Sequence, residues 1–289
     1  NMNVQWYPGH MTKAKRQMQE DIKLIDLIIE LVDSRVPLAS RNPDIDAICG
    51  GKPRMIVLNR MDLADPAATK RWAEYFKKKG MAVIATDCKT KKGISAFTPA
   101  ARLACAEKLE RDAKRGMSRP LRVMVVGIPN VGKSSLINRM AKGSRAQVED
   151  RPGVTRSKQW VPIDRNLELL DTPGILWPKF DDQSVGMNLA YTGAVKDDIL
   201  DVETLGCHLM AYLGEHYPDA LKAAYKLSTL PEREAEKNDI AYGYRLLEAA
   251  GKKRGFLISG GEVDTERMAK ILLDEFRSAK LGRFTLELP

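Results

Sequence analysis

The stretch RVMVVGIPNVGKSSLINRM, residues 122–140, decides the fold. An apolar, β-rich run leads into Gly127, and the pattern G-x-x-x-x-G-K-S ends at Ser134, directly before residues with helical spacing. A glycine-rich loop between a strand and a helix cradles phosphates with its backbone N–H groups. The alternative is a glycine turn with a surface lysine, and the flanking strand and helix argue against it.

Six consecutive residues of this loop are expected to line a nucleotide. Lys133 is expected to supply a positive charge to the β and γ oxygens, and Ser134 is expected to bind magnesium. The set is Asn130, Val131, Gly132, Lys133, Ser134 and Ser135. By itself, the loop indicates a nucleoside triphosphate without saying which one.

A second group of residues is expected on the phosphate side of the same site. In LELLDTPGI, residues 167–175, Asp171 follows a strand and can hold magnesium through water, while Gly174 can donate its N–H to a γ-phosphate. DTPG is also an ordinary turn sequence. Thr155 is expected on the same magnesium ion from its position between the two motifs, although a threonine is unremarkable in such a loop.

Two further strand ends predict which base is bound. In MIVLNRMD, Asn59, Arg60, Met61 and Asp62 follow a buried-looking strand. The carboxylate of Asp62 can accept two N–H groups from guanine, and adenine offers no such pair. The alternative is an aspartate that caps a helix. The sequence therefore predicts a guanine nucleotide.

The segment VIATDCKTKKG, residues 83–93, is expected to make the second base contact. The backbone around Asp87 and Cys88 is expected to meet the guanine O6 atom, and Lys89 is expected to cover the ring.

The order of short β-rich runs and helical stretches predicts an α/β fold, a mostly parallel sheet with helices on both faces. After Pro178 the pattern becomes helical, which predicts a smaller all-helical domain. The expected parts are an arm over residues 1–20, a nucleotide-binding domain over 21–178 and a helical domain over 179–289. The expected strands are residues 24–32, 55–58, 82–85, 122–126 and 167–170, and the expected helices include 66–79 and 94–114.

Charge and cysteine usage bear on partners and compartment. The 47 cationic residues exceed the 38 acidic ones, which gives a formal charge of +9 and suggests a polyanionic partner. The four cysteines form no CxxC pair, which indicates reduced thiols in a cytoplasm. The most apolar run, residues 24–32, is too short to cross a bilayer, so no membrane partner is expected.

The motifs occur in the order NRMD, TDCK, GIPNVGKSS, PGVT and DTPG. The chain therefore resembles the translation-factor class of GTPases in circularly permuted order, and it is most similar to the ribosome biogenesis GTPase A group, also called YlqF. The segment WYPGHM, residues 6–11, adds to this resemblance, which covers nearly the whole chain. Two positions depart from the usual pattern. Arg60 replaces a lysine in NKxD, and Asp87 replaces the usual serine of SAK.

His10 is the candidate catalytic residue. Many GTPases orient the attacking water with a glutamine after DxxG, but Ile175 occupies that position here. His10 can hold a water at neutral pH, the turn at Pro8 and Gly9 is expected to aim it, and the resemblance implies the same role. The alternative is that His10 only contacts RNA or packs within the arm.

The resemblance implies a GTP hydrolase that binds the immature large (50S) ribosomal subunit and its ribosomal RNA and promotes a late assembly step. GTP or GDP and Mg²⁺ are the implied ligands. Asn130 is similar to the asparagine that lets K⁺ bind in this class, and a plain turn asparagine is the alternative. The helical domain, with the cationic loop GKKRG at residues 251–255, is expected to contact RNA, and no DNA partner is expected.

Two other functions remain open from the sequence. One is an RNA-binding scaffold whose guanine nucleotide site is largely structural. The other is a GTPase that acts on transfer RNA or at a membrane surface, and the lack of any anchor argues against it. Comparing GTP hydrolysis with and without large subunits separates the first from the main hypothesis.

Overall fold

The structure is a computed structural model that describes residues 8–141, 159–179, 182–195, 201–235 and 238–289, with side chains from Thr12 onward. The chain divides into two compact units. The first extends to Lys179 and also includes Glu287–Pro289, and the second ends at Leu286. Each unit has its own elements and its own core.

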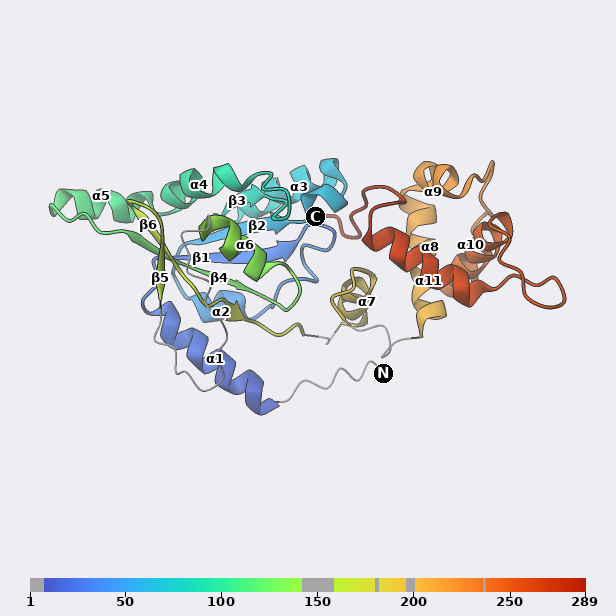
Figure 1. The fold of residues 1–289 in the computed structure, drawn as a ribbon, viewed down its shortest axis with the longest axis horizontal. Helices are drawn as coiled ribbons and strands as arrows, with labels where there is room; N and C mark the ends of the chain where they lie inside the picture. The colour runs from blue at the N-terminus through green and yellow to red at the C-terminus, as the bar shows by residue number, and fades with distance from the viewer. Residues whose placement is uncertain (1–7, 142–158, 180–181, 196–200, 236–237) are drawn as a thin grey trace. The chain divides into compact units, whose positions relative to one another are not determined.

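The first unit is built on a seven-stranded sheet with the order β3-β2-β1-β4-β6-β5, and β7 pairs with β4 (Figure 1). All pairs are parallel except β5 with β6. The strands are β1 (Leu27–Asp33), β2 (Arg54–Asn59), β3 (Ala82–Ala85), β4 (Leu121–Gly127), β5 (Trp160–Asp164), β6 (Leu167–Leu170) and β7 (Gly174–Ile175). The expected α/β class with a mostly parallel sheet is therefore confirmed.

Strand β1 lies between β2 and β4, and all seven of its residues are buried. A parallel strand covered on both faces is apolar at consecutive positions, which explains the run LIIELV. In the observed register Ile29 lies opposite Met55 on one side and Val125 on the other. This central pairing brings the NRMD segment and the glycine-rich loop to the same edge of the sheet.

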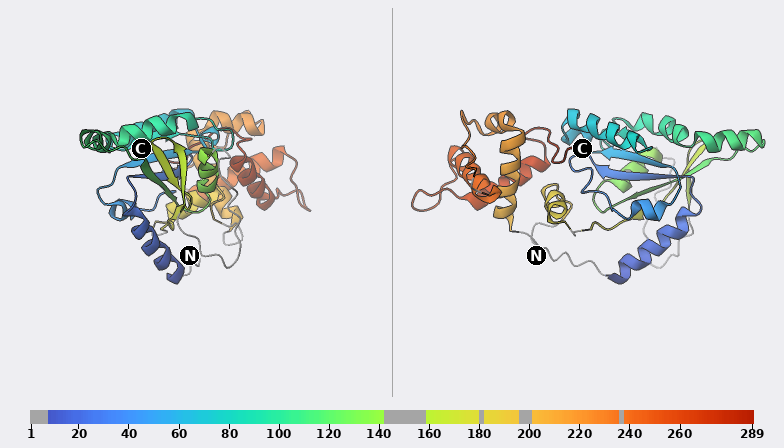
Figure 2. Two further views of the ribbon diagram at one scale, coloured as in Figure 1. Left: turned by 60° about the vertical axis from the view of Figure 1, so that its left-hand side comes forward. Right: turned by 180° about the vertical axis from the view of Figure 1, so that it is seen from behind.

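Helices lie on both sides of this sheet (Figure 2). Helix α3 shows why they pack there: Trp72 and Phe76 are fully buried and join the core cluster of Val32, Ile56 and Leu58. Asp65 caps α3 by accepting from the Ala67 N–H, the usual role of an aspartate directly before a helix. The helices of this unit are α1 (Pro8–Ile22), α2 (Ile45–Cys49), α3 (Pro66–Lys78), α4 (Phe97–Ala104), α5 (Ala106–Lys114) and α6 (Lys133–Ala141), with short 3-10 turns η1 (Met61–Leu63) and η2 (Ile94–Ala96).

Three local expectations need correction. The arm begins as a helix at Pro8 rather than with a turn, because proline suits the first helical position, where its missing N–H is not needed. The first strand begins at Leu27, since Leu24 is 44% exposed and lies in the turn after α1. The expected helix over residues 94–114 is interrupted at Cys105, whose backbone leaves helical geometry.

The chain is anchored to the first unit at the two points where it leaves and re-enters it. Lys179 forms an ion pair of 2.7 Å with Asp44. Glu287 accepts from the N–H of Leu38 at 2.8 Å, and the buried indole of Trp72 donates to its carbonyl at 2.9 Å. Both anchor points therefore use the segment that follows β1.

The second unit is helical. Helix α8 packs closely on its neighbours because Gly206 and Gly243 leave room: an added Cβ would lie 2.6 Å from the Ala269 side chain and 1.7 Å from the Cys207 carbonyl, respectively. Arg277 donates to the carbonyl of Ala190 at the end of α7. The helices are α7 (Gln183–Tyr191), α8 (Val202–His216), α9 (Pro218–Tyr225), α10 (Asp239–Lys253) and α11 (Thr265–Arg277).

The expected cationic loop GKKRG is not a loop. Gly251 to Lys253 form the last turn of α10, and Arg254 is its C-terminal cap. Arg254 makes two bonds to Glu275, at 2.7 and 3.0 Å, and lies over the Tyr225 ring at 4.9 Å. The arginine therefore stabilises the helical unit, while Lys252 and Lys253 stay exposed.

None of the helices in the described parts of the chain combines the length and the apolar character that a membrane span requires.

Candidate nucleotide-binding site

Four predicted motifs follow the carboxyl ends of parallel strands. NRMD ends and follows β2, TDCK follows β3, the glycine-rich loop follows β4 and DTPG follows β6. Ligands of open α/β sheets bind outside the carboxyl ends of the strands, in the loops that gather there. The order of the strands in the sheet thus collects motifs that are far apart in the chain.

The glycine-rich loop needs its glycines for two different reasons. Gly132 has φ of 102°, and an added Cβ would lie 2.4 Å from the Asn59 amide nitrogen. At Gly127 an added Cβ would lie 2.9 Å from the Leu31 carbonyl oxygen. The loop therefore passes so close to β1 and β2 that side chains are excluded. Asn130, with φ of 68°, completes the turn and is exposed.

Lys133 begins α6 and is buried, with its ammonium group donating to the Ile128 carbonyl at 2.5 Å. Burial lowers the pKa of Lys133 to about 8. A buried cation with a single carbonyl acceptor leaves donor capacity for an anion. Ser134 and Ser135 follow in the first turn of α6 and are exposed.

The lowered pKa predicts how nucleotide binding depends on pH. Only the protonated amine attracts phosphate, so the affinity for a nucleoside triphosphate should be full below pH 8 and fall roughly tenfold for each pH unit above it. The check is titration calorimetry from pH 7 to 9. The Lys133→Ala variant should bind the nucleotide weakly and without this pH dependence. Its affinity measured over the same pH range shows how much ionisation of the nucleotide base contributes. A flat profile in the unaltered protein would contradict the prediction.

Asn59 links three of the loops. Its amide nitrogen donates to the Val131 carbonyl at 2.9 Å in the glycine-rich loop. Its amide oxygen accepts from the Thr86 hydroxyl at 3.1 Å and from the Cys88 N–H at 3.3 Å. The side chain is buried, so these bonds are protected from water. Asn59 therefore fixes the base-side loops against the phosphate-side loop.

Asp62 lies in the turn η1 and is exposed, so its carboxylate is accessible to a base. The neighbouring Met61 N–H donates to the Thr86 carbonyl at 3.0 Å, which fixes the turn to the strand end of TDCK. The assignment of Asp62 to guanine stays a prediction that this geometry permits.

The contacts of Arg60 explain why an arginine stands where a lysine is usual. Its backbone is left-handed, with φ of 57°, and the two terminal nitrogens of its guanidinium group have different partners. One donates to the Asn130 carbonyl at 2.7 Å, and the other to the Asp33 carboxylate at 3.2 Å. A lysine has one point charge and lacks the planar fork that makes both contacts.

The carboxylate of Asp33 was not predicted from the sequence. It is buried at the end of β1 and accepts from the Arg35 guanidinium at 2.8 and 3.0 Å. Burial by itself would raise the pKa of Asp33, but the charges of Arg35 and Arg60 outweigh it and lower the pKa. The only available signal was a charged pair, DSR, directly after an apolar strand.

The TDCK loop is shaped by its own aspartate and by α6. The Asp87 carboxylate accepts from the Lys89 N–H at 3.0 Å and the Thr90 hydroxyl at 2.7 Å, so it closes a turn and leaves base contacts to the backbone. Arg139 donates to the carbonyls of Cys88 and Lys89 at 2.7 and 2.5 Å. Sequence reasoning missed Arg139, because its helical position does not reveal its partner.

A cavity of about 340 Å³ lies where α6 meets this loop. Its lining consists of Cys88, Lys89, Ser135, Asn138 and Arg139. Burial raises the pKa of the Cys88 thiol, so this group remains protonated near neutral pH. All of the lining residues except Asn138 are predicted or newly found residues of the nucleotide site.

The DTPG segment lies beside the glycine-rich loop. Asp171 follows β6, is half-buried and accepts from the Thr172 hydroxyl at 3.1 Å. Gly174 lies in β7 opposite Val126, and an added Cβ there would come within 2.9 Å of the Met18 sulfur of α1. Helix α1 therefore packs directly on the strand that contains Gly174.

Two predicted residues lie where the structure describes no side chain. His10 lies in the first turn of α1, eight residues and roughly 12 Å along the helix axis from Met18, and its side chain is outside the described part. Thr155 lies in residues 142–158, which are outside the described residues. Their roles stay predictions.

The two histidines of α8 lie in the helical unit, away from the nucleotide motifs in the sequence. His208 is half-buried and His216 is exposed, and the His216 ring lies 4.2 Å from that of Tyr212. The described residues contain no group of three or more His, Cys, Asp or Glu side chains arranged to hold a metal ion.

The fold and the site together define a circularly permuted P-loop GTPase. Residues 122–222 match a family model described as "50S ribosome-binding GTPase". The whole chain is 46% identical to ribosome biogenesis GTPase A of Bacillus cereus, over 95% of that protein. It is 32% identical to the Thermotoga maritima protein of the same name, over 99% of this chain and 95% of that one.

Solved structures agree with these relatives. The GNP-bound structure of YlqF from T. maritima has a TM-score of 0.60 and 27% identity, over 96% of this chain and 98% of that one. The GDP-bound YlqF structure has a TM-score of 0.60 and 26% identity, over 95% and 99%. The chain belongs to the ribosome biogenesis GTPase A family, and it is a GTP hydrolase.

Proposed function

We propose that the protein binds the immature large (50S) ribosomal subunit, promotes a late step of its assembly, and hydrolyses GTP to GDP and phosphate when the particle activates it. Family membership supports the ribosomal role, as does the description of the matching family model. One observation carries the nucleotide part of the proposal. The bonds of Asn59 to Val131 and Cys88 join the base-side and phosphate-side loops around one site.

Each residue of the site has a proposed role. Asp62 binds guanine, Lys133 binds the β and γ oxygens, and Gly174 donates its N–H to the γ-phosphate. His10 orients the attacking water, because the apolar side chain of Ile175 cannot do so. When the γ-phosphate leaves, DTPG is no longer held by it, and α1, which packs on β7 through Met18, is free to respond.

Magnesium is proposed at the hydroxyls of Ser134 and Thr155 and, through water, at Asp171. The residues present fit: the Ser134 hydroxyl is exposed at the start of α6, and Asp171 follows the strand adjacent to β4. Both supply oxygen ligands, which Mg²⁺ prefers. Bound there, the ion would neutralise negative charge on the phosphates. Asn130, exposed on the loop, is the proposed contact for K⁺.

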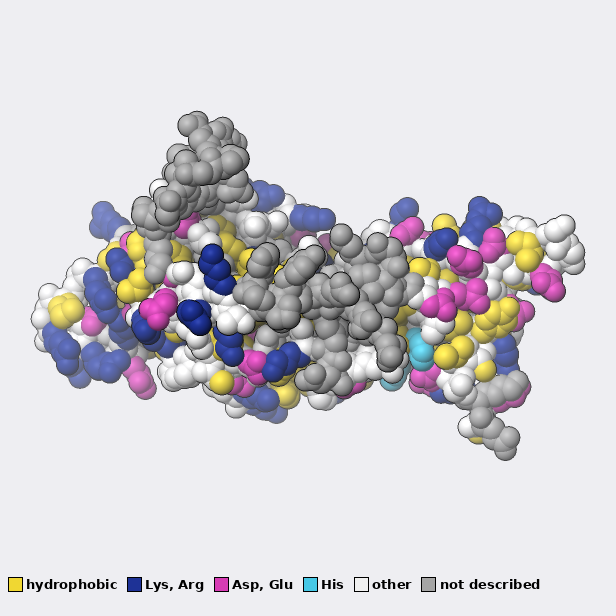
Figure 3. All heavy atoms as spheres, turned by 90° about the horizontal axis from the view of Figure 1, so that it is seen from below, with side chains coloured by type: hydrophobic (Ala, Val, Ile, Leu, Met, Phe, Trp, Pro, Cys, Tyr) yellow, Lys and Arg dark blue, Asp and Glu magenta, His cyan; other side chains and the backbone are white. Residues whose placement is uncertain are grey.

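Ribosomal RNA is the proposed macromolecular partner. The formal charge of +9 favours a polyanion. Lys and Arg side chains gather over the end of the first unit that carries α5, whereas acidic and basic side chains are mixed over the helical unit (Figure 3). The helical unit is proposed to contribute RNA contacts of its own, with Lys252 and Lys253 exposed at the end of α10.

Hydrolysis measured with and without large-subunit precursors tests the proposal. The particle should stimulate turnover strongly, because activation by a partner reaches about 10⁵-fold in small GTPases. His10→Ala should lower the stimulated rate by about 10²-fold or more, as expected for a residue that positions water. Co-sedimentation with the particle should be stronger with a non-hydrolysable GTP analogue than with GDP. If the particle does not stimulate hydrolysis and His10→Ala has no effect, the protein is instead an RNA-binding scaffold with a structural nucleotide site.

A further inference from the structure

The outer face of α3 carries a cationic hollow that the nucleotide site does not use. Its volume is about 440 Å³, and its lining consists of Lys70, Arg71, Glu74, Tyr75, Lys78 and Pro289. The five lining positions of α3 recur at helical spacing, so the hollow follows one face of α3 for more than two turns. The opposite face of the helix is buried through Trp72 and Phe76.

The charges of the hollow favour an anion. Lys70, Arg71 and Lys78 are exposed and make no ion pair with any described residue. Glu74 is the single acidic side chain of the lining, and Lys77 lies 3.9 Å from its carboxylate. Exposed cations without acidic partners create a local positive potential that attracts an anionic ligand.

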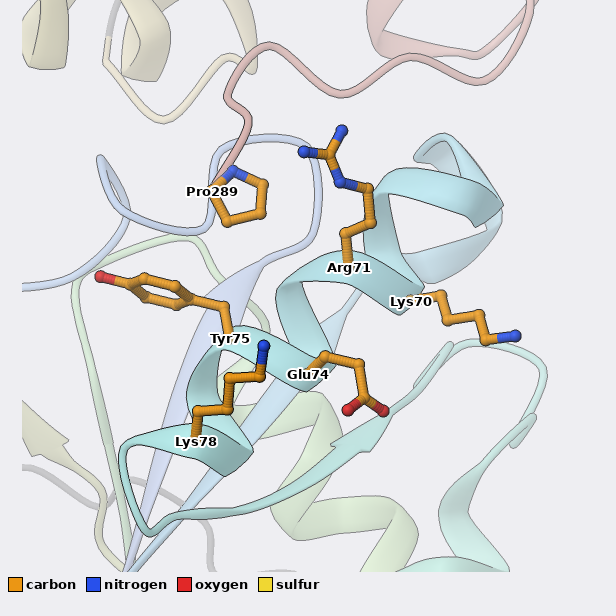
Figure 4. A pocket seen from close by; sticks show the side chains of 6 residues that line it. All are labelled: Lys70, Arg71, Glu74, Tyr75, Lys78 and Pro289. Carbon is orange, nitrogen blue, oxygen red and sulfur yellow. The ribbon is translucent and has the colours of Figure 1, made fainter.

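The spacing of the cations favours a ligand with repeated charges. Arg71 and Lys78 are seven residues, roughly 10 Å, apart along the helix axis. Their side chains flank the hollow from its two ends, and Lys70 points away from both (Figure 4). Two separated cations suit successive phosphates of one strand better than one small anion.

An aromatic wall closes one side of the hollow. The rings of Tyr75 and Pro289 lie on the same side of it (Figure 4). The Tyr75 ring is held by edge contacts to Trp72 and Phe76, each with ring centres 5.2 Å apart. A rigid ring beside cations is the combination with which proteins bind unpaired nucleotides, the cations for the backbone and the ring for a base.

We propose that this face of α3 binds an unpaired segment of RNA, with Arg71 and Lys78 on neighbouring phosphates and a base against Tyr75. The inference rests on the proposed function, in which the RNA of a ribosomal particle is the partner. The combination of cations and a ring matches the phosphates and bases of an RNA strand, and an acidic protein is the alternative outcome of the test below.

The test is fluorescence anisotropy of the full chain with a labelled single-stranded 12-nucleotide RNA over a series of KCl concentrations. Arg71→Ala with Lys78→Ala should weaken binding about tenfold at low salt. It should also reduce the slope of log K against log salt by about 1.4, because each phosphate that is no longer neutralised accounts for about 0.7. Glu74→Gln should strengthen binding by a factor of about two to five, because it removes a like charge from the phosphate path.

The charge-matched control is Lys270→Ala with Lys280→Ala, which removes two exposed cations from α11 and the segment that follows it. This pair should leave the slope nearly unchanged, and both pairs should retain the thermal stability and GTP affinity of the unaltered chain. Equal losses of affinity in the two pairs, or weaker binding by Glu74→Gln, would overturn the α3 site.

Failure of the site and failure of the proposed function give different results. If the unaltered chain binds neither the RNA nor large-subunit precursors, the proposed function fails and the α3 site with it. If the unaltered chain binds and the Arg71 and Lys78 pair binds equally well, only the α3 site is wrong. Particles whose RNA has been digested with nuclease give the third outcome. If the unaltered chain still binds them and the Arg71→Ala, Lys78→Ala double variant does not, the surface contacts an acidic protein and the RNA assignment is wrong.

Discussion

Asp62→Asn is expected to change the preferred base from guanine to xanthine. The Asp62 carboxylate offers acceptors for the N1–H and the amino group of guanine, and asparagine replaces one acceptor with a donor. A site built to bind particular donors strongly rejects a ligand that leaves them unpaired, so GTP affinity should fall roughly 100-fold or more. Xanthosine triphosphate carries a carbonyl at the position of that amino group and should gain affinity.

Competition of GTP and xanthosine triphosphate for a fluorescent nucleotide measures this change. Asp65→Asn is the matched control, because it removes the same charge from the nearby cap of α3 without facing the base. It should lower stability slightly and leave the base preference unchanged. An Asp62→Asn protein that still prefers GTP by its original margin would remove Asp62 from the base site.

Asn59→Ala is expected to weaken both GTP binding and the first unit itself. The substitution leaves the Val131 carbonyl and the Thr86 hydroxyl without their buried partner. Each such group costs about 1–3 kcal/mol, so the unit should lose roughly 2–6 kcal/mol of unfolding free energy and several degrees in Tm. GTP affinity should fall by about 10²-fold, because three loops lose their common anchor.

Calorimetric melting and GTP titration of the same samples test the two effects together. Asn166→Ala is the control, since Asn166 is exposed in the turn between β5 and β6. It should behave like the unaltered protein in both measurements. If Asn59→Ala keeps its Tm and loses only affinity, the asparagine contacts the nucleotide without fixing the loops.

The regular part of the fold could be predicted because local patterns determine it. The expected strands at residues 82–85 and 167–170 coincide with β3 and β6, where short apolar runs lie between turn residues. Strands β5 and β7 were missed for different reasons. β5 is an edge strand containing Pro162, and the two-residue β7 exists only through its pairing with β4. Such pairing depends on tertiary structure and leaves little trace in a short window.

The candidate site could be predicted where a motif requires particular atoms. Gly132, Lys133 and Asp171 were expected from phosphate and metal chemistry, and they lie at one edge of the sheet. Arg139 and Asp33 could not be predicted, because their partners are distant in sequence and are fixed only by packing. Arg60 stands between these cases: the sequence showed an unusual residue, and only the structure showed its two partners.

Because the chain is anchored where it leaves and re-enters the first unit, the helical unit can be deleted without disturbing the first unit. Lys179 pairs with Asp44, and Glu287 accepts from the Leu38 N–H. Leu38 and Asp44 are six residues apart, so their Cα atoms lie within roughly 20 Å of each other. A short flexible linker can therefore replace the chain between Lys179 and Glu287 while both anchors persist. The first unit is thus contiguous in space although it is interrupted in sequence. It should fold on its own as a smaller GTPase.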